Sequence, residues 1–397
     1  MKQTSNIQSQ YVSQLPHANL DKQSVLVRVD LNVTRNQDGA IRNDFKLKAI
    51  LPTLQLIKNK GGTIVLLGHC GRPKAQEKNL SLEPIARWFE RNEFTTTFAR
   101  TPKEALALLK TVKSDIMLLE NLRFFKEETE LNESFAQSLA LLGTYYVQDA
   151  FGNLHRNHTS MTLLAQKFTP ENRTIGLLVE KELDVLRHLH NPEQPFIMIS
   201  GGNKAETKLP MIEQLTDKIS AFLPCPGLVF ALLKVLNKPI GKTQISDAAV
   251  KAAESFLIKA YRNNLSILWP VDYLVTTNTF EKPSDCFVTK KIEDNHVGIA
   301  FGPETAQLFK EALKTANTIF LNGMSGNANY PETLEGMRII IQALQSSNAI
   351  KIISGGDTVG IAQELGIDQT TATFLTGGGS TLAFLSGQLL PGLLVLS

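Results

Sequence analysis

The chain has 397 residues, more than a single hydrophobic core usually supports, so its length predicts two domains of ordinary size. An apolar content of 43% and a charged content of 20% are typical of a soluble globular protein, and they exclude a fibrous or disordered chain. A formal net charge of +3 is too small to indicate nucleic acid or a membrane surface as a partner.

Cysteine content and the N-terminal segment both favour a reducing cytoplasm. Three cysteines, Cys70, Cys225 and Cys286, lie far apart, which indicates neither a disulfide framework nor a zinc site. The first residues lack the apolar core of a signal peptide, and no run reaches the roughly 18 apolar residues that a membrane span needs. We therefore expect a cytoplasmic protein.

In chain order, short β-branched runs alternate with amphipathic segments, the pattern of βαβ units in a parallel sheet. In the first half, the sequence predicts strands at 25–29, 63–67, 116–120 and 144–148, and helices at 46–60 and 81–92. In the second half, it predicts strands at 195–200, 265–269, 318–322, 350–354 and 371–376. Residues 275–300 mix short β-like pieces with charge and receive no assignment.

Between the two series lies the charged segment 179–195, which is helix-prone and ends in Pro192 and Pro195. We interpret it as an interdomain helix and hinge. The predicted fold is of the α/β class, with two Rossmann-like three-layer αβα domains on parallel sheets, at 1–178 and 196–385.

Polar and cationic side chains follow several of the predicted strands in the first half of the chain. In an open α/β sheet, ligands bind beyond the carboxyl ends of the strands, so these side chains should meet at one edge. Guanidinium groups match phosphate and carboxylate oxygens two at a time, which favours a small phosphorylated acid as the ligand. The residues are Asp30, Asn32, Lys46, His69, Arg72, Arg123 and Arg156.

Glycine-rich turns follow three predicted strands in the second half, at 200–208, 354–358 and 376–381. A helix that begins directly after such a turn points free N–H groups at a phosphate, although ordinary structural turns stay open as the alternative. Lys204 and Lys208 are four apart, so on a helix they would share a face. Asp357 follows two glycines and could hold Mg²⁺ together with nucleotide phosphates. We interpret the acidic run at 126–133 as a solvated face.

These motifs, in this order, resemble the phosphoglycerate kinase family from about residue 20 to the end of the chain. In the first half, the family patterns RVDFNVP, SHLGRPKG, LLENVRF and NDAFGxAHRxHAS resemble residues 28–34, 68–75, 118–124 and 148–160. In the second half, GGxKVxxK, LPVD, WNGPMG, GGGDS and STGGGASLEFL resemble residues 201–208, 269–272, 321–326, 354–358 and 375–385.

The resemblance implies a two-lobed monomeric enzyme of glycolysis and gluconeogenesis that reversibly transfers the γ-phosphoryl group of Mg-ATP to 3-phosphoglycerate, giving ADP and 1,3-bisphosphoglycerate. It implies that the first domain binds phosphoglycerate, that the second binds nucleotide, and that residues 386–397 pack back on the first domain.

The resemblance also implies the site residues. Substrate binding falls to Asp30, Leu31, Asn32, Lys46, His69, Cys70, Gly71, Arg72, Arg123 and Arg156. Catalysis falls to Lys46, Lys204, Lys208 and Gly379, with backbone donors at Gly377, Gly378 and Gly379. Nucleotide binding falls to Lys204, Lys208, Gly227, Asn322, Asn329, Gly355, Gly356, Asp357 and Thr358, and Mg²⁺ binding to Asp357.

Several positions depart from the family pattern. Lys46 stands where the family has an arginine, which keeps the charge but loses the planar fork. Residues 225–229 read CPGLV in place of GGGMA, and Asn329 replaces the glutamate that meets the ribose. Ser354 replaces a glycine, Ala300 an aspartate and Cys70 a leucine, and we interpret Cys70 as a small buried residue.

Two alternatives to a working kinase therefore stay open. One is a weakened relative that binds phosphoglycerate or nucleotide without useful turnover. The other is a dinucleotide-dependent oxidoreductase, although no G-x-G-x-x-G opens a helix after a strand in this chain.

Overall fold

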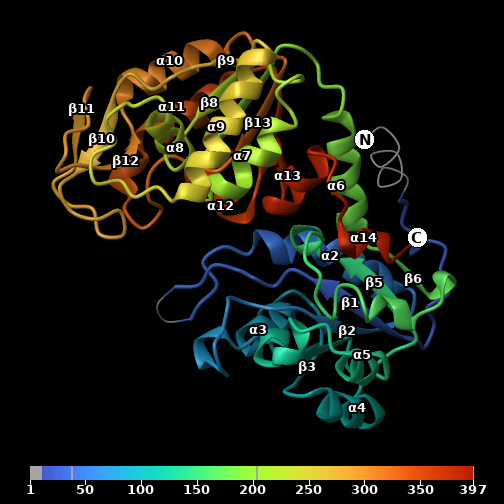
Figure 1. The fold of residues 1–397 in the computed structure, drawn as a ribbon. Coiled ribbons are helices and arrows are strands. Elements are labelled where there is room, and N and C mark those ends of the chain that lie inside the picture. The colour runs from blue at the N-terminus through green and yellow to red at the C-terminus, as the bar shows by residue number, and fades with distance from the viewer. Residues whose placement is uncertain (1–10, 37–38, 203, 397) are drawn as a thin grey trace. The chain divides into compact units, whose positions relative to one another are not determined.

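The computed structural model describes residues 11–36, 39–202 and 204–396. The chain divides into two compact units (Figure 1). The first unit runs from the N-terminus to Arg187 and includes Gly387–Ser397, and the second unit is His188–Ser386. Each unit contains a parallel sheet flanked by helices, so the predicted α/β fold class is confirmed.

In the described part of the chain, the first unit has a sheet of six parallel strands in the order β3-β4-β2-β1-β5-β6. The strands are β1 (Ser24–Val29), β2 (Thr63–Leu67), β3 (Thr96–Ala99), β4 (Ile116–Leu119), β5 (Tyr145–Asp149) and β6 (Arg173–Ile175). The α-helices are α2 (Phe45–Asn59), α3 (Glu83–Arg91), α4 (Pro102–Thr111), α5 (Glu133–Ala140), α6 (Leu177–His188) and α14 (Pro391–Leu394).

The second unit has, over its described residues, a sheet of six parallel strands in the order β15-β14-β13-β7-β8-β9. These strands are β7 (Phe196–Ser200), β8 (Ala221–Pro224), β9 (Ser266–Ile267), β13 (Thr318–Asn322), β14 (Ile350–Ser354) and β15 (Thr373–Leu375). The α-helices are α7 (Ala205–Glu213), α8 (Leu228–Val235), α9 (Asp247–Arg262), α10 (Pro303–Leu313), α11 (Glu335–Ser346), α12 (Gly356–Glu364) and α13 (Gly379–Leu385).

A small antiparallel sheet in the second unit accounts for the segment that the sequence left unassigned. It has the strand order β11-β10-β12, formed by β10 (Tyr273–Thr276), β11 (Phe287–Thr289) and β12 (Val297–Phe301). Its residues Tyr273 and Val275 pack against Phe230 of α8, which ties this sheet to the rest of the unit.

Side chains alternate between the two faces of a strand, and in the first unit helices cover both faces of the sheet. Val25, Val27 and Val29 of β1 pack in one cluster with apolar residues of α2 and α3. Leu26 packs on the opposite face with residues of α4 and α5. Arg28 alternates with the valines, so it lies on the same face of the strand as Leu26, and its side chain is fully buried.

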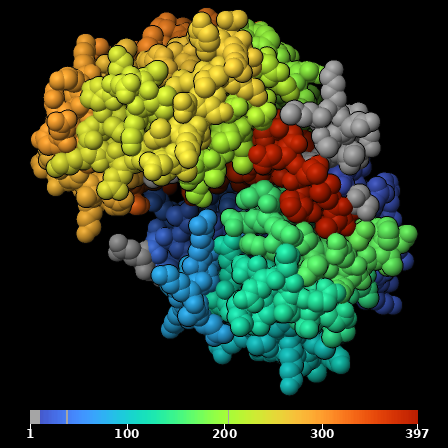
Figure 2. Space-filling model, viewed as in Figure 1, coloured from blue at the N-terminus to red at the C-terminus, as the bar shows by residue number. Residues whose placement is uncertain are grey.

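The C-terminal residues from Gly387 on belong to the first unit. The Gly392 N–H donates to the Leu154 carbonyl at 3.0 Å, and Val395 and Leu396 pack against the core of that unit. In Figure 2 the red end of the chain lies against green atoms of this unit.

Strands β3, β6 and β8 were not predicted from the sequence. They have only three or four residues each, TTFA, RTI and AFLP, which is too short for a strand pattern to stand out from the surrounding sequence. The strand predicted at 265–269 is wrong in extent, because only Ser266–Ile267 pairs. Within the segment 179–195, which we interpreted as an interdomain helix and hinge, helix α6 ends at His188, ahead of Pro192 and Pro195, which cannot continue it.

Asp149, the last residue of β5, is fully buried at the beginning of α6. Its Oδ1 accepts a hydrogen bond of 3.1 Å from the Val179 N–H, and a Cβ on Gly176 would lie 2.2 Å from its Cγ. Burial outweighs the hydrogen bonds that Asp149 accepts and raises its pKa to about 7. The carboxyl group therefore titrates near neutral pH.

We expect Asp149→Asn to flatten the pH dependence of the stability. Because the folded-state pKa is raised, the protonated carboxyl stabilises the fold at low pH, and this contribution is lost as the pH rises through about 7. Urea unfolding of the parent protein should lose on the order of 2 kcal/mol between about pH 5 and pH 8, and the variant clearly less. Asp184→Asn, an exposed change on α6, is the control; equal slopes for both variants would contradict the assignment.

Candidate active site

The polar residues predicted in the first half lie at the carboxyl edge of the first unit's sheet. Asp30 follows β1, His69 follows β2, and Arg123 follows β4 on the short helix η2 (Leu122–Phe124). Arg156 follows β5, and Lys46 lies in the first turn of α2. We call these residues, with Asn32 and Arg72, the anion site.

Lys46 pairs with the buried carboxylate of Asp30. Its Nζ donates to Asp30 Oδ2 at 2.8 Å and to the Asn32 carbonyl at 3.2 Å, while Asp30 Oδ1 accepts from the Asn32 N–H at 3.0 Å. Burial alone would raise the pKa of Asp30, but the Lys46 ammonium and these hydrogen bonds outweigh it and hold the pKa below its ordinary value. The carboxylate therefore fixes the position of the Lys46 ammonium.

The loop after β2 is held by side chains of neighbouring loops. The Gly71 N–H donates to Asn32 Oδ1 at 2.8 Å, and the Arg123 guanidinium donates to the Gly71 carbonyl at 2.5 Å. Asn121 accepts from the Cys70 N–H at 3.2 Å and donates to the Cys70 carbonyl at 2.8 Å. The Cys70 thiol is buried, and burial raises its pKa. The interpretation of Cys70 as a small buried residue is therefore confirmed.

Arg72, Arg123 and Arg156 lie close enough to perturb one another. Burial, then the charges of Arg156, Arg28 and Arg72, lower the pKa of Arg123 to about 10. Burial and Arg72 likewise lower the pKa of Arg156. Mutually repelling guanidinium groups at one edge of the sheet form a site that can bind a polyanion.

The packing of Leu31 restricts its predicted role, and one other sequence expectation is wrong. The side chain of Leu31 is fully buried against Gly68, so only its backbone can face a ligand. The acidic run at 126–133 is not uniformly a solvated face, because Glu128 is fully buried. Its carboxylate accepts hydrogen bonds from the Ser160 N–H at 2.9 Å and from the Ser160 hydroxyl at 2.6 Å, which replace the water that it loses.

In the second unit, Lys208 lies on α7 with its ammonium directed at the turn after β7. Its Nζ donates to the Gly201 carbonyl at 2.6 Å and to the Asn322 carbonyl at 3.3 Å. Burial lowers the pKa of Lys208 to about 8, with a further contribution from Lys204. Lys204 itself precedes α7 with non-helical backbone angles and is exposed, so the two lysines do not share a helix face.

The turns after β7, β13 and β14 contact each other through backbone and short side chains. The Gly323 N–H donates to the Thr358 hydroxyl at 3.0 Å, and Asn322 Nδ2 donates to the Ser354 carbonyl at 3.1 Å. Gly323 has φ +100°, and a Cβ there would lie 2.2 Å from the Gly201 carbonyl oxygen, so only glycine fits. Asn322 is therefore a structural tie between two strand ends, with its side chain buried.

A cavity of about 830 Å³ opens beside these turns within the second unit. Of the predicted nucleotide residues, those that line this glycine-lined cavity are Lys204, Lys208, Gly227, Asp357 and Thr358. Its apolar lining includes Phe230, Ile245, Phe280, Val297 and Ile299. The latter residues were missed because they come from separate elements, and each alone looks like an ordinary core residue.

The remaining predicted residues of the second unit lie elsewhere. Asn329 is exposed and is not part of the cavity lining, where Asn327 and Ala328 take its place. The Asn329 N–H instead donates to Asn327 Oδ1 at 3.0 Å. Gly355 and Gly356 begin α12, and Gly379 begins α13.

The altered loop at 225–229 touches the cavity at two residues. Pro226 and Gly227 line it, and the Pro226 carbonyl accepts from the Gly202 N–H at 3.0 Å. Cys225, Leu228 and Val229 are fully buried and contribute packing. The substitutions therefore change the wall of the cavity at Pro226 and the core beneath it elsewhere.

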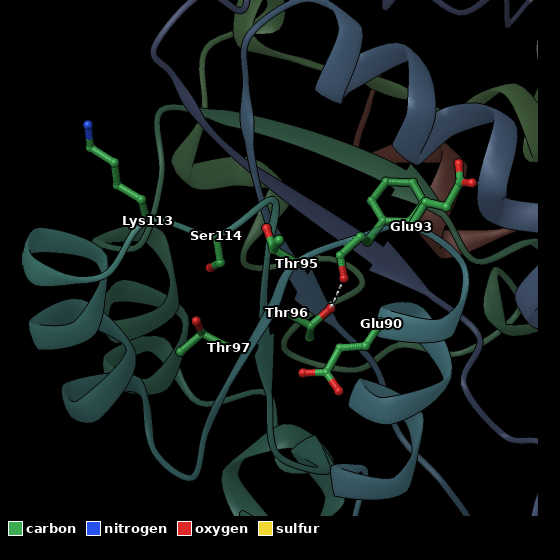
Figure 3. Close-up of a pocket in the computed structure, with 8 residues that line it drawn as sticks. Glu90, Glu93, Thr95, Thr96, Thr97, Lys113 and Ser114 are labelled. Carbon is green, nitrogen blue, oxygen red and sulfur yellow. Dashed lines mark hydrogen bonds between the residues drawn. The ribbon is translucent and has the colours of Figure 1, made fainter.

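A hollow of about 450 Å³ in the first unit lies away from the anion site (Figure 3). It lies at Thr96, where β3 begins, and at Ser114, just before β4, so it is at the amino ends of these strands. Ligand sites of open α/β sheets lie at the opposite edge. The residues that line it are Glu90, Glu93, Phe94, Thr95, Thr96, Thr97, Lys113 and Ser114.

Over the described residues, no group of three or more His, Cys, Asp or Glu side chains is arranged to hold a metal ion. Across the same residues, none of the helices combines the length and apolar character needed to cross a membrane. Asp357 is left as an exposed carboxylate at the cavity.

One parallel α/β unit carries the anion site, and the second carries a glycine-lined cavity with a half-buried lysine, an arrangement typical of an enzyme of the phosphotransferase class. A model of the family "Phosphoglycerate kinase" matches residues 15–388. The chain belongs to the phosphoglycerate kinase family. It is thus a kinase that acts on a carboxyl acceptor, and the oxidoreductase alternative has no support.

Named relatives match nearly the whole chain. The phosphoglycerate kinase of Dictyoglomus turgidum is 35% identical over 381 residues, covering 94% of this chain and 95% of the relative. That of a Nostoc species is 32% identical over 394 residues, covering 97% and 98%. The solved phosphoglycerate kinase structure from Coxiella burnetii is 30% identical with a TM-score of 0.73, covering 96% and 97%. That from Pyrococcus horikoshii is 26% identical with a TM-score of 0.83, covering 97% and 98%.

Proposed function

We propose that the protein reversibly transfers the γ-phosphoryl group of Mg-ATP to the carboxylate of 3-phosphoglycerate, giving ADP and 1,3-bisphosphoglycerate. The observation that carries this proposal is the half-buried Lys208 ammonium beside a glycine-lined cavity, in a chain whose other unit has an anion site. The weakened-relative alternative is not favoured, because the anion site and the cavity lysine are both retained.

The acceptor would bind in the first unit. Its phosphate and carboxylate offer oxygens to Arg72, Arg123 and Arg156, whose mutual repulsion an anion relieves. His69 and the backbone of the loop at Cys70 and Gly71 would complete the site. Asp30 and Asn32 would act by holding Lys46 and this loop in place.

The donor would bind in the second unit. The backbone N–H groups at the start of α12, from Gly356, Asp357 and Thr358, suit phosphate oxygens, whereas the Gly355 N–H already donates to the Leu375 carbonyl at 3.1 Å. Gly227 and the apolar lining suit the base, while Lys204 and Lys208 supply positive charge for the phosphates. Asn322 would maintain these turns, and Asn329, which lies outside the cavity lining, would not meet the ribose.

Transfer itself requires positioning and charge stabilisation more than covalent chemistry from the protein. Lys208 and Lys46 would stabilise the negative charge of the migrating phosphoryl group, and the Gly379 backbone would add a donor. Donor and acceptor must meet for the reaction, so we assign a hinge role to residues 179–195. In this assignment, residues 1–178 with 386–397 form the acceptor domain and 196–385 the nucleotide domain.

The donor set suits Mg²⁺ better than a transition metal. Magnesium is commonly held by one or two carboxylates, with nucleotide phosphates and water as the other ligands, and Asp357 is such a carboxylate. When bound, the ion would neutralise charge on the phosphates. Asp357 would hold it at the start of α12.

We expect Asp357→Asn to raise the Mg²⁺ concentration needed for half-maximal rate by about 10- to 100-fold, because an amide gives up the charge of the ligand. The measurement is a magnesium titration of the rate at fixed nucleotide. Glu364→Gln, an exposed change on the same helix, serves as the control. Identical titration curves for both variants would rule out a metal role for Asp357.

The proposed setting is that of a monomer in the cytoplasm, acting in glycolysis and gluconeogenesis with small-molecule substrates only. The proposed reaction is tested by following ADP formation from Mg-ATP with and without 3-phosphoglycerate. Formation of ADP that depends on 3-phosphoglycerate supports it. ADP formation at the same rate without the acceptor would indicate an ATPase instead.

A further inference from the structure

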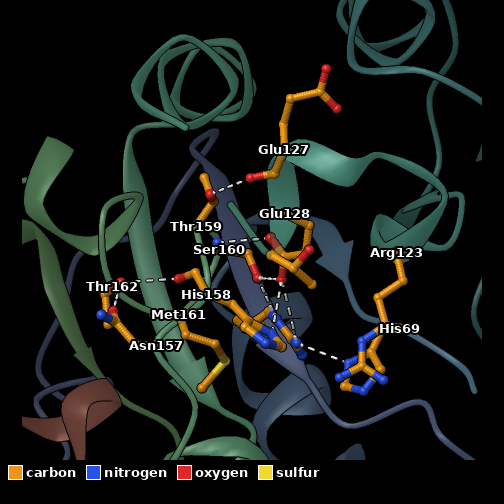
Figure 4. Close-up of polar contacts among 12 residues, drawn as sticks. His69, Arg123, Glu127, Glu128, Asn157, His158, Thr159, Ser160, Met161 and Thr162 are labelled. Atoms are coloured by element: carbon orange, nitrogen blue, oxygen red, sulfur yellow. Dashed lines mark hydrogen bonds and ion pairs between the residues drawn. The ribbon is translucent and has the colours of Figure 1, made fainter. Parts of the chain in front are cut away.

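A buried polar network lies beneath the anion site (Figure 4). Arg28 on β1 is fully buried, so its guanidinium cannot contact a ligand held at the sheet edge. Its Nε donates to the Ser160 hydroxyl oxygen at 2.8 Å, one terminal nitrogen donates to the Val29 carbonyl, and the other lies 3.1 Å from Nδ1 of His69. Among the described residues, His69 is the member of the anion site that Arg28 contacts.

The contact with Arg28 determines which ring nitrogen of His69 carries a proton. A guanidinium has donors and no acceptor, so Nδ1 of His69 has to accept and is unprotonated. Burial, followed by the charges of Arg28, Arg123 and Arg156, holds the pKa of His69 well below its usual range, so the ring is neutral. The single proton then sits on Nε2, which makes no hydrogen bond to any residue in the described part of the chain.

Glu128 and Ser160 hold Arg28 in place. The Ser160 hydroxyl has one hydrogen, which it donates to Glu128 Oε1 at 2.6 Å, so its oxygen is free to accept from Arg28 Nε. Glu128 Oε1 also lies 4.0 Å from a terminal nitrogen of Arg28 and 3.9 Å from Nδ1 of His158. The carboxylate thus supplies the counter-charge for a guanidinium that has no access to water.

We propose that Arg28, anchored by Glu128 and Ser160, is a positioning residue that fixes the Nε2–H tautomer of His69. His69 then presents a neutral N–H donor to an anionic oxygen of the acceptor substrate. This inference rests on the proposed function for the identity of the acceptor, but the tautomer itself does not depend on it. Arg28 is distinct from Arg72, Arg123 and Arg156, which act by their own charge.

The first test is the protonation state of the His69 ring nitrogens in the ligand-free protein, read from their ¹⁵N chemical shifts and assigned with a His69→Gln variant. The inference predicts an unprotonated Nδ1 and a protonated Nε2. A protonated Nδ1 in the parent protein would overturn it. This measurement requires no substitution at Arg28 and no catalytic turnover.

The second test uses Arg28→Met together with Glu128→Gln, which removes both buried charges and leaves neither unpaired. The expected results are a mixture of His69 tautomers and an increase of about 10- to 100-fold in KM for 3-phosphoglycerate, with KM for ATP unchanged. Arg28→Lys, which keeps a donor-only group, should restore the tautomer in part. Arg91→Met, an exposed arginine of the same unit, is the control.

The outcomes distinguish a failure of the positioning role of Arg28 from a failure of the proposed function. An unchanged tautomer in a folded Arg28→Met/Glu128→Gln protein overturns the positioning role of Arg28. An altered tautomer with an equal rise in both KM values also overturns it, because the damage would then be general. If the protein has no turnover with 3-phosphoglycerate, the proposed function fails while the tautomer measurement still decides the role of Arg28.

Discussion

Replacing Lys208 with alanine is expected to lower kcat by about 10²- to 10³-fold, the scale seen when one preorganised donor to a developing charge is removed. The ammonium is held by the Gly201 and Asn322 carbonyls beside the cavity, so it needs no reorganisation when phosphoryl charge develops. The measurement is the steady-state rate with saturating Mg-ATP and 3-phosphoglycerate.

The control for this substitution is Lys251→Ala, an exposed lysine on α9 of the same unit. Its kcat should equal that of the parent protein. A Lys208→Ala enzyme with a rate within a few-fold of the parent would remove Lys208 from the mechanism. Circular dichroism of both variants establishes whether the fold is retained.

Replacing Lys46 with methionine is expected to lower kcat/KM for 3-phosphoglycerate by about 10²-fold or more. It should also destabilise the first unit by about 3 to 5 kcal/mol, because the nearly buried Asp30 carboxylate loses its partner at 2.8 Å. Activity is measured with 3-phosphoglycerate as the varied substrate, and stability by urea unfolding.

Two further variants distinguish the effect of the positive charge at position 46 from the effect of the side-chain shape. Lys46→Met with Asp30→Asn leaves no unpaired charge, so it should recover stability but not activity. Lys46→Arg restores the residue type of the family and should keep or raise the rate, by up to about 10-fold, because a planar fork orients two oxygens at once. A fall in rate on Lys46→Arg would show that this site has adapted to lysine.

Much of the fold could be predicted because the buried parallel strands carry their own signal. β2 and β13 are largely apolar runs, and β1 and β14 are apolar apart from one internal basic residue each, so their positions were predicted within a residue or two. The antiparallel sheet of β10, β11 and β12 was not, because β11 is half exposed and its sequence has no such run. Its existence depends on packing against α8, which is a tertiary contact.

The anion site could be predicted because each of its residues follows a strand of the same sheet, and parallel strands end at a common edge. The network beneath it could not. Glu128 belongs to an acidic run whose other charged members are largely exposed, and its burial depends on Ser160, 32 positions away in sequence. Arg28 looks like one more residue of a strand until its contact with His69 is known.

The lining of the cavity in the second unit was predicted at the glycine-rich turns and less well elsewhere. Glycines after strands mark where backbone N–H groups are available, so the turns at 200–208 and 354–358 could be recognised. The sequence does not reveal that Asn329 lies outside the lining while Asn327 lies within it. That difference follows from the path of the loop, in which Asn327 donates to the Phe280 carbonyl at 2.8 Å.

The most direct measurement is the turnover of purified protein with Mg-ATP and 3-phosphoglycerate, coupled to reduction of the 1,3-bisphosphoglycerate formed. A Lys208→Ala preparation measured in parallel reveals any contaminating host enzyme. The proposed function predicts turnover far above that preparation and dependent on both substrates. Turnover equal to that of the Lys208→Ala preparation, with both ligands still bound, would contradict it and identify a relative that binds ligands without catalysis.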